Sequence, residues 1–424
     1  MAAGIPAPVI SAAVAARGAG IAGQTHGPLA EGPFAAAVHT AKDRQALPSL
    51  VVGGQVNDDL VLARTLLAAT LAAVADSSHG LEWAVAVGRT PGGPVVMLTS
   101  TEGRGWLPPG LFLPSEVNLP WRRDSILGAA GREAFAALEG TADPARILAE
   151  FGMMAGRRRR VRISALVSSA AISDGARAAI ADDAAVEGWV SSAECAVDFT
   201  APGVGLVDRL ALAGSDELLR QAETVPEREI RAKCLELARV ADARVRAAVS
   251  GIDWETATRR ARRQHILDAL HAGQHIPASW WDQIRAADNT MASALLSRQV
   301  DVSYVPVGGI RPDVSGREAI RGKVFERRAD ELLLLLAVDA PDRQTLRDAF
   351  YAYGQIVEHP QLPAAAGVLT SEMTRIGRAA VPDVEVSRSV GPGSHGVGAP
   401  GFGGGSPSVA ELLKGPAGSG GPAK

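Results

Sequence analysis

Cysteine and aromatic residues are scarce in this 424-residue chain, and each scarcity excludes a class of structure. The two cysteines, Cys195 and Cys234, lack the Cys-x-x-Cys spacing, so the sequence supports neither a disulfide framework nor a thiolate zinc site. This indicates a reducing compartment, and we expect a cytoplasmic protein. Only 4% of the residues are aromatic while 47% are hydrophobic, so the core must consist mostly of Ala, Val and Leu, which argues against an all-β fold.

An excess of positive charge and a long apolar run are also missing. The net charge of -3 provides no general attraction to nucleic acid or anionic lipid. The longest apolar run, residues 332–338, is far shorter than the ~20 residues that span a bilayer, and residues 1–16 lack the basic start of a signal peptide. We expect a soluble protein without a membrane span. Lysine is rare among the basic residues, which, with the excess of Ala and Gly, indicates an actinobacterial source.

The first half of the chain has the pattern of an α/β module. Residues 1–40 are rich in Ala, Gly and Pro, which predicts a disordered arm. Leucines at helical spacing predict a helix over 57–77. Large apolar residues then alternate over 81–87, and turn residues at 90–94 separate this run from a second β-rich run at 95–101, so we expect a β-hairpin.

Further elements follow the hairpin. A short extended piece is expected at 111–114, helices at 125–138 and 143–154, and a strand at 161–167 that could join the hairpin's sheet. From about Val204 the pattern is helical. Helices are expected over residues 224–249, 254–271, 279–297, 315–338, 341–358 and 363–379.

Two features refine the helical half. Thr224 and Glu227 have the spacing of a capping box, and the leucine run at 332–336 predicts a central helix that is buried nearly all round. The predicted fold class is therefore α+β, with a small sheet followed by an α-helical bundle. The predicted domains are a disordered arm, an α/β module, a helical domain and a disordered Gly/Pro-rich tail, at residues 1–40, 41–200, 201–381 and 382–424.

One stretch offers a weak candidate metal site. His265, Asp268, His271 and His275 are spaced i, i+3, i+6 and i+10, which could align nitrogen and oxygen ligands along a helix. A Gly and a Pro further on should end the helix near residue 272 and remove His275 from the stripe. Because no fourth ligand is evident, we favour surface histidines and predict no cofactor; a metal-dependent enzyme is one alternative.

Two clusters of arginine could contact phosphate. One is the run from Arg157 to Arg160 with Arg162, and the other lies within residues 259–263. No stacking aromatics are interleaved with either cluster, so solvated or salt-bridged faces are favoured. Nucleic-acid binding through Arg157–Arg162 is a second alternative, and a basic patch for an acidic protein partner is an intermediate interpretation.

The glycine-rich run at 103–110 matches no nucleotide-binding loop, because Pro108 and Pro109 block the helix that such a loop must open. Trp106 in this run has two interpretations. It can be buried as a plug at the open end of the hairpin, which is the commoner fate of a large apolar side chain. It can also stand exposed in a rigid loop as an interface anchor.

Two other segments carry candidate contact residues. Trp280 and Trp281 are adjacent on a helix and point about 100° apart, so one of them can lie in the core while the other contacts a partner. We select Trp281 as the contact residue. In the tail, Leu412 and Leu413 belong to a short amphipathic island that could form a docking helix. No Ser, Cys or Thr lies in a recognisable catalytic arrangement, so no catalytic residue is predicted.

The chain resembles a known family in its hairpin and Trp106 region. The stretch from Leu81-Glu82-Trp83-Ala84-Val85 through Gly103-Arg104-Gly105-Trp106-Leu107-Pro108-Pro109 to Leu113-Pro114, joined to a helical half, resembles a mycobacterial protein family related to the C-terminal region of EspK-like proteins of the ESX (type VII) secretion systems. The resemblance covers most of residues 45–380. It implies a cytosolic accessory or chaperone-like role toward secreted partners.

One departure bears on that role. Secreted substrates of the pathway carry a Trp-x-Gly turn and a Tyr-x-x-x-Asp/Glu signal, whereas Tyr304, Tyr351 and Tyr353 have no acid four residues later. The resemblance therefore implies a protein that acts on the pathway rather than its cargo. We expect a non-enzymatic protein-interaction protein, with a type VII secretion component or substrate as partner and Trp106, Pro108, Pro109, Trp281, Leu412 and Leu413 as contact residues.

Overall fold

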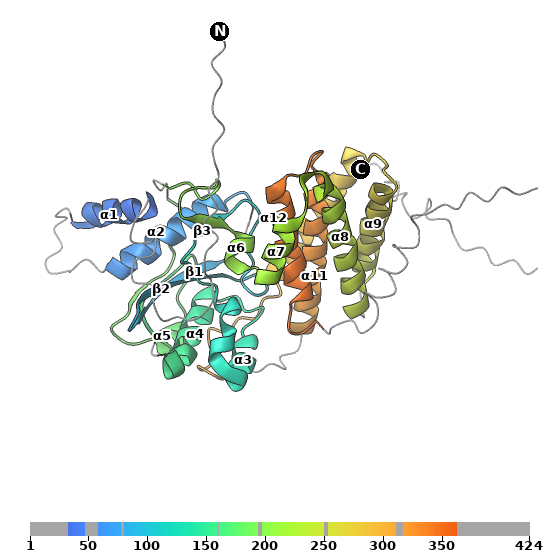
Figure 1. Cartoon of the computed structure of the whole chain (residues 1–424). Helices are drawn as coiled ribbons and strands as arrows, with labels where there is room; N and C mark the ends of the chain where they lie inside the picture. Colours follow the sequence, from blue (N-terminus) through green and yellow to red (C-terminus); the bar gives the residue numbers. More distant parts are fainter. Residues whose placement is uncertain are drawn as a thin grey trace, which may run out of the picture. The chain divides into compact units, whose positions relative to one another are not determined.

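The structure is a computed structural model that describes residues 33–46, 58–77, 80–159, 161–193, 197–249, 253–310 and 317–362. These residues all belong to one compact unit. They form twelve α-helices and six short strands, which confirms the α+β fold class (Figure 1). No helix in these ranges combines the length and apolar character needed to cross a membrane.

A four-stranded sheet forms the centre of the first half, with strands in the order β2-β1-β4-β5. These strands are β1 (Trp83–Thr90), β2 (Gly93–Ser100), β4 (Arg162–Ser168) and β5 (Ala185–Glu187). β1 pairs antiparallel with β2 and with β4, whereas β4 and β5 are parallel. The predicted hairpin is confirmed, as is the prediction that the strand expected at 161–167 joins its sheet.

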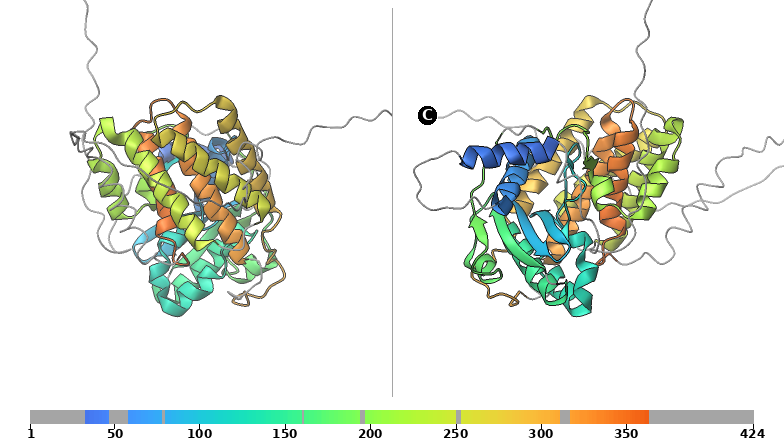
Figure 2. Two further views of the ribbon diagram at one scale, coloured as in Figure 1. Left: turned by 90° about the vertical axis from the view of Figure 1, so that its right-hand side faces the viewer. Right: turned by 60° about the vertical axis from the view of Figure 1, so that its left-hand side comes forward.

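Alternation along β1 explains why helices cover both faces of this sheet. Trp83 and Val85 pack into the hydrophobic cluster that contains the apolar residues of α2 (Asp58–Ala73). Ala84 and Ala86 pack into a second cluster with α4 (Pro144–Arg159). Because successive side chains of a strand point to opposite faces, large residues face one helix and small residues face the other. The sheet is therefore the middle layer of three (Figure 2).

The predicted disordered arm at 1–40 is wrong in its last part. Helix α1 (Pro33–Ala46) begins inside it, with Phe34 and Val38 buried in the cluster that also contains residues of α2. The Phe34 ring lies 5.9 Å from that of Phe199. An Ala-rich segment has high helix propensity but is too short to be stable alone, so these tertiary contacts decide its structure.

Helices fill the rest of the described chain. Their bounds are α3 (Gly128–Ala136), α5 (Asp174–Ala178), α6 (Arg209–Ala213), α7 (Asp216–Thr224), α8 (Ile230–Ala248), α9 (Trp254–His271), α10 (Ala278–Leu296), α11 (Arg317–Leu334) and α12 (Arg343–Val357). The small strands β3 (Phe112–Pro114) and β6 (Leu206–Asp208) pair antiparallel. α11 packs against α8, α10 and α12, so the predicted central position is confirmed. Burial all round is confirmed only in part, because Leu332 and Leu333 are fully buried whereas Leu334 and Leu335 are half-buried, and α11 ends at Leu334.

Some boundaries differ from expectation. The capping box of Thr224 and Glu227 is absent, because α7 ends at Thr224 and a short 3-10 turn (Glu227–Glu229) leads into α8. The expected helix at 363–379, the tail at 382–424 and its Leu412 and Leu413 lie outside the described residues.

One hydrophobic cluster joins the two halves of the described chain. It contains residues of β1 and α2 as well as residues of α8, α11 and α12. The division into a 41–200 module and a 201–381 domain stays a prediction.

After α10 the chain returns to the α/β layers, and we call residues 298–310 the return segment (Figure 2). Val300 pairs with Thr141 through main-chain hydrogen bonds, and Val302 is buried in the cluster around α4. Arg146 of α4 donates to the carbonyl of Val305 at 3.0 Å. The return segment thus forms a second connection between the helical half and the sheet.

Gly175 should not tolerate a side chain. A Cβ atom built on it would lie 1.5 Å from Nη1 of the fully buried Arg146, so we expect Gly175→Ala to lower the free energy of unfolding by about 1–3 kcal/mol through overpacking. Urea denaturation measures this change. Arg177→Ala, an exposed position of the same helix, is the control and should shift it by no more than about 0.5 kcal/mol. Equal effects of the two substitutions would contradict this packing.

Candidate functional site

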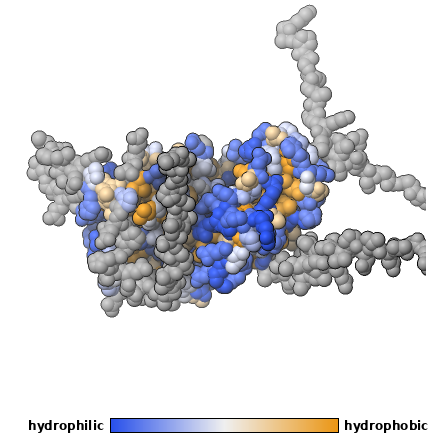
Figure 3. All heavy atoms as spheres, turned by 45° about the horizontal axis from the view of Figure 1, so that its top comes forward, coloured by the Kyte–Doolittle hydropathy of each residue, from blue (hydrophilic) through white to orange (hydrophobic). Residues whose placement is uncertain are grey.

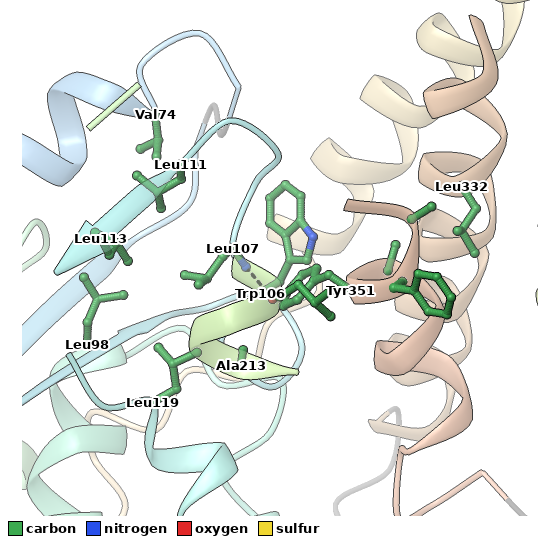
Figure 4. Packing of buried hydrophobic residues seen from close by; sticks show 14 of the residues in the cluster. Val74, Leu98, Trp106, Leu107, Leu111, Leu113, Leu119, Ala213, Leu332 and Tyr351 are labelled. Carbon is green, nitrogen blue, oxygen red and sulfur yellow. Dashed lines mark hydrogen bonds between the residues drawn. The ribbon is translucent and has the colours of Figure 1, made fainter. Parts of the chain in front are cut away.

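The structure buries Trp106 rather than exposing it. Its side chain is only 5% exposed, and its indole Nε1 donates to Oε2 of Glu331 on α11 at 3.0 Å. Figure 4 shows the loop reaching from the sheet toward the helical half, where Trp106 and Leu107 lie beside Tyr351. The interpretation of Trp106 as buried is confirmed, but its partners are helices of the second half and not the hairpin alone. The exposed-anchor hypothesis for Trp106 is wrong, and Pro108 is buried with it, while Pro109 is exposed.

Polar contacts of Leu107 hold the same loop. Its backbone N–H donates to the hydroxyl of Tyr351 at 2.9 Å, the dashed line in Figure 4. Its carbonyl accepts from Nη1 of Arg209 at 3.0 Å, and the Arg209 guanidinium lies 4.6 Å from the centre of the Tyr351 ring. Both main-chain groups of Leu107 are therefore satisfied in a dry environment, as buried backbone requires.

Charged groups surround the Trp106 ring. The Arg328 guanidinium lies over the indole, 4.2 Å from its centre. Arg328 and Arg327 both form ion pairs with Glu102, which precedes the loop. A planar guanidinium stacked on an aromatic face gains cation–π attraction as well as its ion pair. These residues form the joint between the loop and the bundle, which we call the Trp106 joint: Glu102, Trp106, Leu107, Arg209, Arg327, Arg328, Glu331 and Tyr351.

A second group of buried charges lies between α8, α9 and α11. Arg263 is fully buried and contacts three carboxylates, Asp242 and Asp330 at 2.7 Å and Glu326 at 2.9 Å. Arg260 also contacts Glu326, at 2.6 Å. The arginines at 259–263 were predicted to form a solvated or salt-bridged face. The salt bridges are confirmed, but a solvated face is wrong for three of these four arginines, because they turn inward and are neutralised there.

These two groups are one continuous network. Arg259 contacts Asp330 and also Asp288 of α10, and Asp288 lies 2.9 Å from Arg327 of the Trp106 joint. At the far end, Arg209 reaches Asp348 of α12. The network's members are Glu102, Arg209, Asp242, Arg259, Arg260, Arg263, Asp288, Glu326, Arg327, Arg328, Asp330, Glu331 and Asp348. Its six arginines face seven carboxylates, and the half-exposed Arg246, paired with Asp242, supplies a seventh positive charge.

Burial and charge pairing act in opposite directions on the acids of this network. Burial raises the pKa of Asp330 even though Arg263 and Arg259 favour its charged form. Burial would also raise the pKa of Asp288, but Arg327 and Arg259 lower it below its ordinary value. Burial works against the charge of Arg263, yet the surrounding carboxylates raise its pKa. The arginines therefore stay protonated, and ion pairing holds the network together.

The candidate metal stripe does not assemble. His265, Asp268 and His271 are exposed on α9, and the His265 ring stacks on Trp280 with centres 4.6 Å apart. Asp268 accepts from the side chain of Gln264 at 3.0 Å. Among the residues that the structure describes, no three His, Cys, Asp or Glu side chains gather closely enough to hold a metal ion. His265, Asp268 and His271 therefore do not form such a group in this structure.

The choice of Trp281 as contact residue is wrong. Trp281 is 9% exposed and packs in the core, while its neighbour Trp280 is half-buried and lies against His265. Adjacent helical positions do point in different directions, as expected, but the helix is rotated so that Trp281 faces inward. The amphipathic pattern of α10 could have predicted this orientation, because Trp281 lies on the same helix face as the buried Ile284 and Met291.

The described side chains of the first arginine cluster, Arg157 and Arg162, lie on the surface. The cluster starts in the last turns of α4, where positive side chains complement the helix dipole. Arg157 is exposed, and Arg162 forms an ion pair with Asp183 in which both side chains are more than half exposed. Such a pair contributes little to stability. Nucleic-acid binding through Arg157–Arg162 stays untested.

A shallow hollow of about 200 Å³ lies between α1, the start of α2 and the turn of the hairpin. His39, Asp58, Asp59 and Arg89 are among its lining residues. Asp59 accepts from Nε of Arg89 at 2.6 Å and from the hydroxyl of Ser164 at 2.6 Å. These contacts have the character of a structural ion pair at a helix start.

Sequence reasoning missed the aromatic residues that are exposed. Among the described residues, the large exposed apolar or aromatic side chains are Trp189, Val204, Trp254, Tyr304 and Val338. Trp189 is 75% exposed and has a φ of 59°, and it is the one non-glycine described residue with a positive φ. Tyr304 is 94% exposed, in the return segment. Only the turn residues around Tyr304, such as Pro306 and Gly308, could have indicated an exposed loop.

Trp189 and Tyr304 lie on the same border of the α/β layers. The backbone N–H of Trp189 donates to the carbonyl of Ala170 at 3.1 Å, just beyond the end of β4. Tyr304 precedes Val305, which is tied to Arg146 beneath Gly175 of α5. Ala170 and Gly175 flank the short turn into α5. The backbone at Trp189 and beside Tyr304 is therefore held by hydrogen bonds near the start of α5, and both side chains are exposed.

No family model matches the chain, and comparison with curated proteins and with solved structures yields no significant match.

Removing the Trp106 side chain should destabilise the whole unit. Trp106→Ala deletes a buried indole and leaves a cavity between the loop and α11, so we expect the free energy of unfolding to fall by about 3–5 kcal/mol. Chemical denaturation followed by circular dichroism checks this. Trp254→Ala, which removes an 80% exposed indole, is the matched control. A Trp106→Ala variant as stable as the control would show that the joint is dispensable.

The Arg263 centre should be equally sensitive. Arg263→Leu would leave Asp242, Glu326 and Asp330 buried without their shared cation, and we expect a loss of about 3–5 kcal/mol in unfolding free energy. Arg285→Leu breaks an exposed pair with Asp282 and should cost less than about 1 kcal/mol. Thermal and urea unfolding of both variants measure the contrast. Similar losses for the two variants would contradict the role assigned to burial.

Proposed function

We propose that this protein is a non-enzymatic interaction protein that binds a protein partner through the border of its α/β layers near α5. The observation that carries the proposal is the exposure of Trp189 and Tyr304 on pinned backbone. Aromatic residues dominate the binding energy of protein interfaces, because they bury a large area at a small cost in conformational entropy. An indole and a phenol held in fixed positions in water suit that role.

The surroundings of the two aromatics support the same proposal. Val305 and Val307 of the return segment and Ile172 before α5 are half-buried at the edge of the hydrophobic cluster around α4. Residues 302–310 carry no charge. An uncharged segment with half-buried aliphatic residues beside an aromatic anchor has the composition of an interface core, and the exposed Asp174, Arg177 and Asp301 around it would belong to a polar rim. On the face shown in Figure 3, by comparison, hydrophilic residues prevail over the helical half.

We further propose that the partner is a component or substrate of a type VII secretion system and that the protein acts in the cytoplasm. The resemblance of residues 81–114 to the EspK-related family supports this link. Under this proposal Trp106 and Pro108 of the motif do not touch the partner, since both are buried, whereas Pro109 is exposed. The motif stabilises the scaffold that presents the binding residues.

Photo-cross-linking in an actinobacterial host tests the proposal. A benzophenone amino acid replaces Trp189, Tyr304 or, as the matched exposed control, Trp254. We expect one protein to be cross-linked from positions 189 and 304 and not from 254, and mass spectrometry identifies it. A secretion-system protein would support the specific link. Cross-linking that is equal at all three positions, or absent from 189 and 304, would contradict the proposed binding border.

A stability-matched variant completes the test. The double variant Trp189→Ala/Tyr304→Ala removes exposed side chains, so its unfolding free energy should change by no more than about 0.5 kcal/mol per site. We expect it to lose co-purification of the cross-linked protein at unchanged stability. Retention of the partner by this folded variant would refute the role of the two aromatics.

A further inference from the structure

The two edge strands of the main sheet differ in whether another segment of the chain pairs with them. β2 lies at one edge, and Asn118 covers its middle: the N–H of Leu98 donates to the carbonyl of Asn118, and the N–H of Asn118 donates to the carbonyl of Val96, at 3.0 and 2.8 Å. β5 lies at the other edge. Within the described chain, no main-chain group forms a hydrogen bond with the outward side of Ala185–Glu187.

The open edge has few of the features that normally protect such an edge. Natural proteins shield edge strands with lysine, proline, bulges or a covering segment. Here Ala185 and Val186 are uncharged and half-exposed, and the single charge, Glu187, is neutralised by Arg64 at 2.6 Å. Its one protective feature is that the strand has only three residues. The outward N–H and C=O groups of this half-exposed strand therefore have no main-chain partner among the described residues and lie beside small side chains.

Trp189 stands at the end of this edge. It follows β5 by two residues, and the N–H of Val190 returns to the carbonyl of Ser168 of β4 at 3.0 Å, so the chain direction is held on both sides of the indole. The left-handed conformation of Trp189 costs roughly 1–2 kcal/mol for a residue with a side chain. The exposed indole thus follows the strand edge by two residues, on backbone that hydrogen bonds hold to β4 and the turn after it.

We infer that β5 is a docking edge to which an extended segment of the partner protein adds as a fifth strand, with an apolar side chain of that segment packing on the Trp189 indole. This inference rests on the proposed function and specifies its binding mode. Main-chain hydrogen bonds would provide affinity, and the indole would select one side chain. An extended segment is the occupant that the edge fits, because only an extended backbone satisfies a row of outward N–H and C=O groups.

The side chains of β5 restrict which sequences the added partner segment can have. Ala185 and Val186 leave room for side chains of moderate size on the added strand, and the Arg64–Glu187 pair leaves no net charge to attract a strongly charged segment. The segment is therefore an uncharged, β-forming stretch without proline in its paired positions.

Peptides selected against the full chain provide the probe. A phage-displayed library of random dodecapeptides is panned on the folded protein, and the best binder is synthesised with an N-methyl group at each position in turn. We expect N-methylation to weaken binding at least tenfold at only one or two alternate positions, because β5 has three residues and alternate amides of an added strand donate to it. Trp189→Ala should weaken it at least tenfold, and Trp254→Ala less than twofold.

Hydrogen exchange tests whether the peptide binds by adding a strand to β5. The bound peptide should slow amide exchange of the outward N–H groups within residues 185–187. Binding that depends on Tyr304 but tolerates every N-methyl group and leaves exchange at β5 unchanged would overturn strand addition while leaving the proposed function intact. If no protein is cross-linked from position 189 or position 304, the proposed function is refuted as well. A dimer of the wild type, detected by light scattering and lost in Trp189→Ala, would replace the partner segment by a second copy.

Discussion

The buried network of arginines and carboxylates is the interaction on which the rest of the structure depends. It connects Asp242 of α8 to Asp348 of α12 through side chains of α6, α9, α10 and α11 and the loop before Trp106. Moving a charge out of water is costly unless partners surround it, so each member is stable only while its neighbours are in place. The relative positions of these six helices are therefore coupled to one another and to the loop of the sheet.

This coupling explains the role of the most conspicuous stretch of the sequence. The run around Trp106 has the composition of a recognition loop, but its indole, its backbone and the preceding Glu102 are all occupied by groups of the second half. The loop recognises the protein's own helices. A single compact unit follows, in which the sheet and the bundle share a hydrophobic cluster and an ionic network.

A rigid scaffold of this kind suits the display of binding residues at its border. Trp189 and Tyr304 owe their positions to a parallel strand end and to a segment that leaves the bundle and is tied to α4 through Arg146. Neither aromatic belongs to a helix or strand. Their fixed exposure is thus a product of how the layers are assembled, and the open edge of β5 beside them adds a backbone surface with its own hydrogen-bonding capacity.

Local pattern alone was enough for the regular elements. Side-chain spacing and turn chemistry act within a few residues. Local sequence therefore predicts a strand from the alternation at 81–87, a turn at 90–94 and a helix from the 3.6-residue period of α9. Elements that depend on distant contacts were missed or misplaced: α1 needs Phe199 and α2, and β5 needs β4. Short segments of this kind gain too little from local interactions to be recognised.

Burial of polar groups was decided only by the tertiary structure. Arg259, Arg260 and Arg263 resemble a solvated face in the sequence, because arginine is usually exposed and their carboxylate partners lie 21 to 71 residues away. Trp106 and Trp281 are buried, whereas Trp189 is exposed. All three are tryptophan, so the hydrophobicity of the residue type does not distinguish the buried side chains from the exposed one. The sequence by itself determined the α+β class, the hairpin and most of the long helices, whereas long-range pairing of charges and layers decided which residues face solvent and can bind.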